Sequence, residues 1–259
     1  MSKTANEKMP FTSHLEELRS RLIRILIAIG IGFAGCYFFK ERLFEFLTIP
    51  LTSVLPDNSY MIFTSLPEAF FTYLKVSIFA SIFVTSPYIL YQIWKFISPG
   101  LYKSEKKHVF PFVIFSTIFF IGGSLFAYYI VFPLGFKFFV AFGTESIKPM
   151  ISVREFLSFS MKLLIAFGVI FELPIFMYFL ARIGMVNSRI LKAKRKYAIL
   201  TIFVIAALLT PPDVVTQGLM AVPLMILYEI SIWIVKLGEK KSVRTEEDSE
   251  EEGDIEEEV

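Results

Sequence analysis

The chain has 259 residues, of which 55% are hydrophobic and 19% are charged. This composition is too apolar for a water-soluble domain of that length and indicates a protein that crosses a membrane several times. The single cysteine, Cys36, and two widely separated histidines, His14 and His108, exclude a disulfide framework and supply no metal-binding motif. We therefore expect no metal, no cofactor and no thiol chemistry.

The net charge of +2 conceals two regions of opposite sign. Residues 246–259 carry ten of the 24 acidic residues and no basic one, which leaves 26 basic and 14 acidic residues in the rest of the chain. A segment so acidic and so poor in apolar side chains cannot bury enough surface to fold. We predict a membrane domain over residues 1–238 and a disordered cytoplasmic tail over residues 239–259.

Six apolar segments predict six transmembrane helices. They are residues 22–39, 70–96, 109–132, 156–183, 197–210 and 214–235. The fifth would cover only about 21 Å, less than the roughly 30 Å hydrocarbon core of a bilayer. It is followed closely by the sixth, so we expect a low hairpin in which Asp213 caps the sixth helix. The predicted fold class is an all-α integral membrane protein.

Lysine and arginine alternate in number from one connecting segment to the next. The segments on one side of the membrane carry five, four, six and four of these residues, and those on the other side carry two, three and none. Because basic residues concentrate in cytoplasmic loops, both termini are predicted to be cytoplasmic.

Local signals predict helix starts and small-residue packing. Ser13 with Glu16, and Ser152 with Glu155, have the spacing of a capping box, so a helix is expected to start at each serine. Residues 42–47 predict a short amphipathic surface helix in the first outer loop. Adjacent glycines at positions 122 and 123 would permit close helix approach.

One carboxylate, Glu172, lies near the centre of an apolar segment. An ionised side chain at mid-depth of a bilayer costs about 2.5 to 3.5 kcal/mol, so it must face protein or water. Pro174 removes a backbone donor two residues later and is expected to bend the helix there. Glu172 is either a protonated or internally paired structural acid, or part of a functional site.

Polar side chains gather at the predicted cytoplasmic entry to the first span. On a helix, His14, Glu17, Arg21 and Arg24 share one face. They form either a binding face or an ordinary ion pair between Glu17 and Arg21. Glu105 is the single acid of residues 97–108, and a neighbouring lysine could equally neutralise it.

Four segments, in order over about residues 10–238, resemble the signature sequences of the TatC family, the multi-span subunit of the twin-arginine protein translocase. They are His14-Leu-Glu-Glu-Leu-Arg19, Phe96-Ile-Ser-Pro-Gly-Leu-Tyr-Lys-Ser-Glu105, Phe167-Gly-Val-Ile-Phe-Glu172-Leu-Pro and Leu209-Thr-Pro-Pro-Asp213-Val-Val-Thr-Gln217. The resemblance implies a receptor in the cytoplasmic (inner) membrane of a bacterium or archaeon. It would bind twin-arginine signal peptides of folded proteins and nucleate export driven by the proton-motive force, together with single-span subunits of the TatA and TatB type.

The resemblance also assigns roles to particular residues. It implies that the signal peptide binds at Glu17, Arg19, Phe96 and Glu105. It further implies that Glu172, Asp213 and Gln217 contact the membrane helix of a partner, and that Pro50 shapes the first outer loop.

A different function class competes with this one. A secondary transporter or proton channel could use Glu172, Glu229, Lys75 and Lys162 as an internal polar path. Such proteins usually contain internal repeats and discontinuous helices, and the sequence offers only a faint repeat of a proline followed by a tyrosine. No ATP-binding loop or nucleophile triad is present in the sequence, so an enzyme is not expected.

Overall fold

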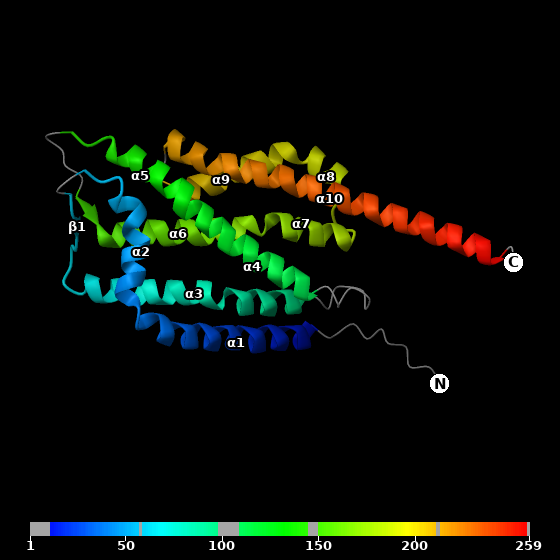
Figure 1. The fold of residues 1–259 in the computed structure, drawn as a ribbon, viewed down its shortest axis with the longest axis horizontal. Coiled ribbons are helices and arrows are strands. Elements are labelled where there is room, and N and C mark those ends of the chain that lie inside the picture. Colours follow the sequence, from blue (N-terminus) through cyan, green and yellow to red (C-terminus); the bar gives the residue numbers. More distant parts are fainter. Residues whose placement is uncertain (1–10, 57–58, 98–108, 145–149, 211–212, 258–259) are drawn as a thin grey trace. The chain divides into compact units, whose positions relative to one another are not determined.

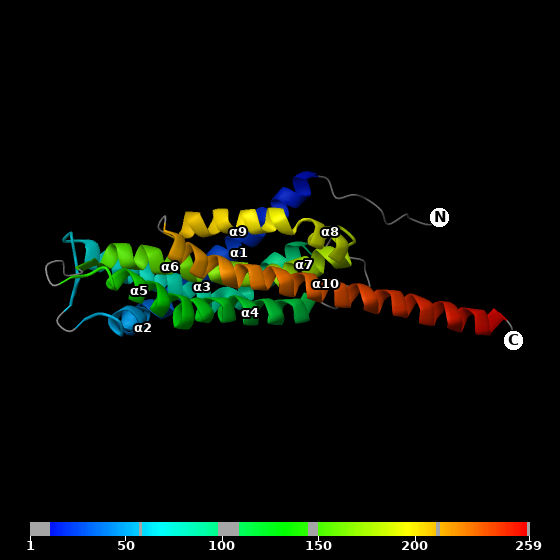
Figure 2. The ribbon, with the colours of Figure 1, turned by 90° about the horizontal axis from the view of Figure 1, so that it is seen from above.

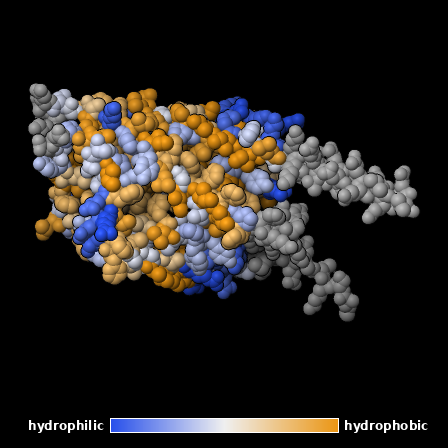
Figure 3. Space-filling view, in the orientation of Figure 1, coloured by the Kyte–Doolittle hydropathy of each residue, from blue (hydrophilic) through white to orange (hydrophobic). Residues whose placement is uncertain are grey.

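A computed structural model describes residues 11–56, 59–97, 109–144, 150–210 and 213–257, and nearly all of them are helical (Figure 1). The chain divides into two compact units. One consists of Met1–Leu47 and Ser65–Thr117, and the other of Thr48–Thr64 and Ile118–Val259. Large apolar side chains such as Leu26, Ile31 and Leu208 are more than half exposed, and Figure 3 shows hydrophobic residues over much of one face. Such a surface is expected where lipid, not water, is the solvent.

The first unit is built on two long helices, α1 (Phe11–Tyr37) and α3 (Glu68–Ile97), which lie side by side. They approach closely at Gly32, where an added Cβ would lie 2.9 Å from Thr85 Cγ2 and 3.3 Å from Ser81 Cβ. The hydroxyls of Ser81 and Thr85 donate to carbonyls of α3 itself, so these small polar side chains pack without an unpaired donor. α1 begins at Phe11, so the predicted start at Ser13 is wrong and that serine lies inside the helix.

The second unit contains α6 (Val153–Phe171), α7 (Leu173–Arg182), α8 (Ser188–Ala193), α9 (Arg195–Leu209) and α10 (Val214–Glu257). α10 runs alongside α7 and α9 (Figures 1 and 2). Ser152 is the N-cap residue of α6, as predicted, although its side chain makes no capping hydrogen bond.

Helix α4 (Val109–Phe126) packs on α6 through two glycines. An added Cβ at Gly123 would lie 2.6 Å from the carbonyl oxygen of Phe167, and one at Gly168 would lie 2.8 Å from Ser124 Oγ. Ser124 Oγ also donates to the Leu164 carbonyl at 2.9 Å across this contact. Close approach was predicted for both glycines of the pair, but it involves Gly123 alone, since nothing lies within 4 Å of an added Cβ at Gly122.

Five helices are long and apolar enough to cross a membrane among the residues that the structure describes. They are Ser13–Tyr37, Glu68–Ile97, Phe110–Val140, Val153–Arg182 and Val214–Glu239. They match five of the six predicted segments, and the chain is an all-helical multi-span membrane protein. The remaining segment corresponds to α9, whose 15 residues make it shorter than the other five.

The third of these helices is longer than predicted. α4 continues through a π-helical turn, η3 (Ala127–Val131), into α5 (Phe132–Val140). The Phe132 N–H donates to the Ala127 carbonyl, five residues back, so the turn holds one extra residue. Pro133 therefore falls at the first turn of α5, where a missing N–H is tolerated, and does not end the helix.

The segments that follow α1 and α5 contain regular structure that the sequence does not predict in full. α2 (Lys40–Thr52) extends the predicted surface helix at both ends. Two short strands, β1 (Met61–Ile62) and β2 (Ile151–Ser152), pair in parallel. A two-residue strand shows no alternation of polar and apolar side chains, so sequence periodicity cannot reveal it.

Helix α10 passes through the predicted boundary at residue 238 and ends at Glu257. The described side chains stop before the acidic part of this helix. The disorder of residues 239–259 stays a prediction.

Candidate functional site

A chain of polar contacts joins α1 to α3 near the start of α1. The Glu17 carboxylate accepts hydrogen bonds through Oε1 from Arg21, whose Nε lies 2.9 Å away and whose Nη2 also donates to it. Arg21 Nη1 donates to Gln92 Oε1 on α3 at 3.1 Å, and Gln92 Nε2 donates to the Tyr88 hydroxyl at 2.7 Å. Arg21 is 9% exposed and Gln92 is 3% exposed, so the helix contact fixes both side chains.

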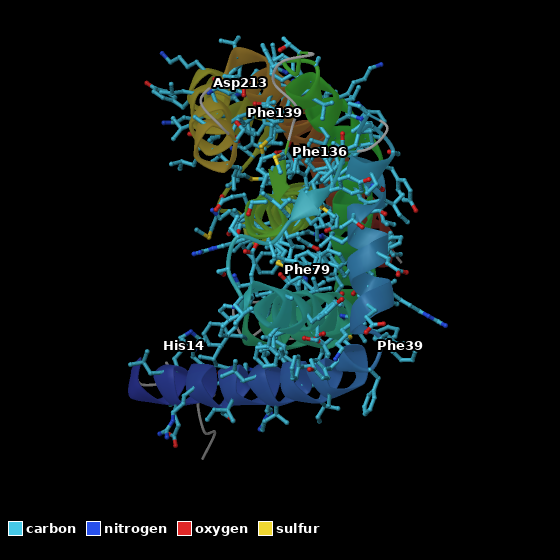
Figure 4. All side chains as sticks on the ribbon, turned by 90° about the vertical axis from the view of Figure 1, so that its left-hand side faces the viewer. His14, Phe39, Phe79, Phe136, Phe139 and Asp213 are labelled. Atoms are coloured by element: carbon cyan, nitrogen blue, oxygen red, sulfur yellow. The ribbon has the colours of Figure 1, made fainter. Side chains whose placement is uncertain are left out.

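An aromatic pair lies beside this carboxylate. The His14 ring, on α1 (Figure 4), stacks on Phe96 with centroids 4.3 Å apart and ring planes inclined by 12°. His14 Nδ1 lies 3.9 Å from Glu17 Oε2. The stacked rings therefore form a flat surface next to one oxygen of the carboxylate.

The two oxygens of Glu17 differ in their contacts. Oε1 is occupied by Arg21, whereas Oε2 is buried and accepts no hydrogen bond within the described part of the chain. A carboxylate can accept about four hydrogen bonds. The structure therefore holds Glu17 in one orientation and leaves it with capacity for a further donor.

The predicted recognition residues divide into three cases. Glu17 and Phe96 come together, with His14 between them. Arg19 is exposed and is not part of this cluster, because two residues along a helix correspond to a turn of about 200°. Glu105 lies outside the described residues.

Of the two interpretations left open for the polar face of α1, the structure shows the ion pair, and it adds Gln92 as a further partner of Arg21. Glu17 and Arg21 do form the ion pair that their spacing allows. Gln92, by contrast, is 71 residues from Arg21, and no local signal in the sequence marks it as the partner. The Glu17–Arg21 spacing identifies a pair within α1 but cannot show which residue of another helix orients it.

Glu172 lies at the break between α6 and α7, as predicted. It ends α6 and precedes α7, with Pro174 in the first turn of the second helix. The Glu172 N–H donates to the Val169 carbonyl at 3.1 Å, three residues back, so the backbone tightens there before the proline. The acid therefore stands at a helix discontinuity inside an apolar segment.

The predicted hairpin forms between α9 and α10, with Asp213 at its turn (Figure 4). The Asp213 carboxylate accepts a hydrogen bond from the Thr216 N–H at 2.7 Å and another from the Thr216 hydroxyl. Gln217 Nε2 donates to the Phe203 carbonyl at 3.1 Å and so joins the two helices. The cap predicted for the sixth segment is confirmed.

We expect Asp213→Ala to lower the free energy of unfolding by about 1 kcal/mol, the usual cost of losing an N-cap.

The Thr216 hydroxyl holds the pKa of Asp213 below its ordinary value of 3.8. Because the folded pKa is the lower one, the carboxylate stabilises the protein above about pH 4, and that contribution is lost as the pH falls through the folded pKa. The measurement is the melting temperature of Asp213→Asn and of the parent at several pH values between 3 and 7. If the difference between the two melting temperatures stays constant down to pH 3, the carboxylate does not make this contribution.

Pro50 is buried near the end of α2. Proline cannot donate a backbone hydrogen bond, so the last turn depends on other donors. The Thr52 hydroxyl donates to the Thr48 carbonyl at 3.2 Å, and the Ser53 hydroxyl to the Pro50 carbonyl at 3.1 Å. Pro50 therefore lies inside the last turn of α2, which continues to Thr52. Its role in shaping the loop stays a prediction.

Three of the four charged residues of the competing transporter interpretation are exposed. Lys75 and Lys162 are exposed. Glu229 pairs with Arg195 at 2.6 Å, and both side chains are about half exposed. A proton or ion path through the interior would need these groups to be enclosed by protein.

Comparison with known proteins gives a single result. The model of the family described as "Sec-independent protein translocase protein (TatC)" matches residues 13–223. The Sec-independent protein translocase protein TatC of Desulforapulum autotrophicum is 54% identical over 249 residues, covering 96% of this chain and 92% of its own length. That of Magnetococcus marinus is 47% identical over 253 residues, covering 97% and 92%.

The fold agrees with a solved structure. A crystal structure of the twin arginine translocase receptor TatC matches with a TM-score of 0.77 and 43% identity, over 87% of this chain and 99% of that one. The residues that the family model matches, 13–223, include the α1–α3 cluster, the helix break at Glu172 and the α9–α10 hairpin. The chain therefore belongs to the TatC family of Sec-independent protein translocase subunits, and it is a transport protein, not an enzyme.

Proposed function

We propose that this chain is the signal-peptide receptor of a twin-arginine translocase and that Glu17 is one of the carboxylates that bind the paired arginines. The observation that carries the assignment is the restrained carboxylate of Glu17, with one oxygen held by Arg21 and the other accepting no hydrogen bond among the described residues. Glu105, Arg19 and Phe96 complete the proposed recognition surface, following the family's motifs.

The geometry suits arginine better than lysine. A guanidinium is a planar fork that donates along fixed directions and stacks on flat rings, whereas an ammonium is a point charge with a tight hydration shell. Beside Glu17 Oε2 lies the stacked pair of His14 and Phe96. Because Oε2 is buried in this structure, a guanidinium can donate to it only after a neighbouring side chain moves aside. It can then also lie on an exposed ring face, a contact that an ammonium makes less well.

Site-specific crosslinking tests the assignment. A photoreactive residue in place of Leu18, 45% exposed on α1, should crosslink to a twin-arginine peptide and much less to the same peptide with paired lysines. The matched control is Ile31, exposed on the same helix and about 20 Å further along it. Equal crosslinking at the two positions, or equal crosslinking of the two peptides at Leu18, would reject this location.

We propose six spans, with both termini in the cytoplasm and the protein in the cytoplasmic membrane. The support is the distribution of basic residues together with α9, which is short but apolar and is followed at once by α10. Reporter fusions at residues 55, 145 and 212 should read as external, and fusions at 102, 190 and 240 as cytoplasmic. A cytoplasmic reading at 145 would contradict the arrangement.

Glu172, Asp213 and Gln217 are proposed to contact the membrane helix of a single-span partner subunit of the TatA or TatB type, with Pro50 shaping the adjoining loop. The partners assemble with the receptor to export folded proteins, driven by the proton-motive force. What supports a role for Glu172 is its place at a helix break inside an apolar segment, where a carboxylate is costly.

We expect Glu172→Gln to reduce recovery of the partner with the purified receptor while leaving the receptor's abundance and melting temperature nearly unchanged. The reason is that the substitution keeps the volume and removes the charge. Glu155→Gln, at an exposed position in the first turn of α6, is the control and should behave like the parent. If Glu172→Gln lowers abundance and leaves partner recovery per receptor unaltered, the residue is structural.

A further inference from the structure

Six basic side chains lie on the second unit between the end of α7 and the start of α9. We call this the α8–α9 basic surface. It consists of Arg182, Arg189, Lys192, Lys194, Arg195 and Lys196, all of them exposed. No acidic residue occurs in the sequence between the first and last of them. Figure 3 shows hydrophilic side chains gathered where α8 lies in Figure 1, next to hydrophobic ones.

Most of this charge is not neutralised by the protein as far as the structure describes it. Arg195 pairs with Glu229 at 2.6 Å. The Glu239 carboxylate accepts hydrogen bonds from the Ser188 N–H at 2.7 Å and from the Ser188 hydroxyl at 2.6 Å. The remaining lysines and Arg189 have no salt bridge to a described acid, so the surface attracts anions.

An exposed apolar stripe continues from this surface along α9. The side chains of Tyr197, Leu200, Val204 and Leu208 are all more than half exposed and recur every three or four residues, which places them on one face. The stripe is about 16 Å long, close to the roughly 15 Å depth of one bilayer leaflet. Lys194 and Lys196 lie 5.4 and 5.1 Å from the Tyr197 ring centroid, so cations and the apolar stripe meet at this tyrosine.

The length of α9 brings lipid headgroups to the basic surface. Its 15 residues span about 22 Å, less than the hydrocarbon core, and a bilayer thins around a helix that is too short. The anionic headgroup layer is thereby drawn to the residues that precede Tyr197.

We infer that the α8–α9 basic surface binds the headgroup of an anionic phospholipid, whose acyl chains lie along the Tyr197–Leu208 face of α9. The ligand is a membrane lipid and not a free anion, because the stripe offers apolar contact that inorganic phosphate cannot use. The inference does not depend on the proposed signal-peptide site, which belongs to the other unit.

Lipid binding to the purified full-length protein in detergent tests this. Phosphatidylglycerol should raise the melting temperature and remain bound in native mass spectra, whereas phosphatidylcholine and inorganic phosphate should do neither. A variant with glutamine at 189, 192, 194 and 196 should bind phosphatidylglycerol on the order of a hundredfold or more weakly, since each basic residue near a lipid surface contributes about 1 kcal/mol. The control is a variant with glutamine at Arg42, Lys75, Lys137 and Lys162, which removes the same charge from exposed positions elsewhere and should bind like the parent.

If the fourfold variant does not fold, two double variants replace it in the test. One combines Arg189→Gln with Lys192→Gln, and the other combines Lys194→Gln with Lys196→Gln. Each should show an intermediate loss of binding with the parent's melting temperature in phosphatidylcholine. Three results would overturn the inference: unchanged affinity in the surface variants, an equal loss in the control, or full competition by inorganic phosphate. The last would indicate a simple anion site.

Discussion

Glu17→Gln should weaken the binding of a twin-arginine signal peptide by about 1.5 to 3 kcal/mol, the usual worth of hydrogen bonds to a charged group. The substitution keeps the side-chain volume and an oxygen that can still accept from Arg21, but it removes the charge that faces the ligand. Isothermal titration of the peptide against the purified receptor measures the change. Glu16→Gln is the matched control, because Glu16 is exposed one residue away and has no contact in the α1–α3 cluster.

Comparing Glu17→Ala with Glu17→Gln should show whether Glu17 contributes to the stability of the receptor as well as to peptide binding. Glu17→Ala removes the carboxylate that holds the buried Arg21, whose one remaining hydrogen bond to a described side chain is that to Gln92. An uncompensated buried charge is costly, so this variant should melt at a lower temperature than Glu17→Gln. Equal melting temperatures for the two would mean that Arg21 does not depend on Glu17, and unchanged peptide affinity in both would remove Glu17 from the recognition site.

Gly123→Ala should lower the free energy of unfolding by about 1 to 3 kcal/mol, the typical cost of overpacking. The added methyl would lie 2.6 Å from the Phe167 carbonyl oxygen and from Phe171 Cγ. The first of these is backbone, so α4 and α6 would have to move apart. They cannot do so without losing the hydrogen bond from Ser124 to the Leu164 carbonyl.

The adjacent glycine provides the control for this prediction. Gly122→Ala adds the same methyl to the same helix where nothing lies within 4 Å, so its melting temperature should equal or slightly exceed the parent's. Thermal unfolding of the three proteins in one detergent is the measurement. A similar loss of stability at both positions would show that glycine matters there for another reason than helix packing.

Features that arise from neighbouring residues were predictable from the sequence. The cap at Asp213 needs only an acid before the helix start, and the break at Glu172 follows from Pro174 two residues later. Five long apolar segments stand out as spans for the same reason. The start of α1 was misjudged at Ser13 because a capping-box pattern also occurs inside helices.

Features that depend on contacts between distant segments were not predictable. Nothing near Gln92 indicates that it orients Arg21, and nothing in the sequence around Met61 or Ile151 indicates that these two residues pair. The third predicted segment ends at residue 132, but a π-turn ahead of Pro133 lets the helix continue. The candidate site was therefore predicted as a set of residues, through the family motifs, while the arrangement that restrains Glu17 required the structure.

The central proposal is that the carboxylates of Glu17 and Glu105 bind the paired arginines of a signal peptide. The most direct test compares peptides with paired arginines and paired lysines for binding to the purified parent protein and to the Glu17→Gln, Glu105→Gln double variant. The parent should prefer the arginine peptide, and the double variant should remain folded and bind both peptides equally weakly. An unchanged affinity and an unchanged preference for arginine in the double variant would contradict the assignment of these carboxylates.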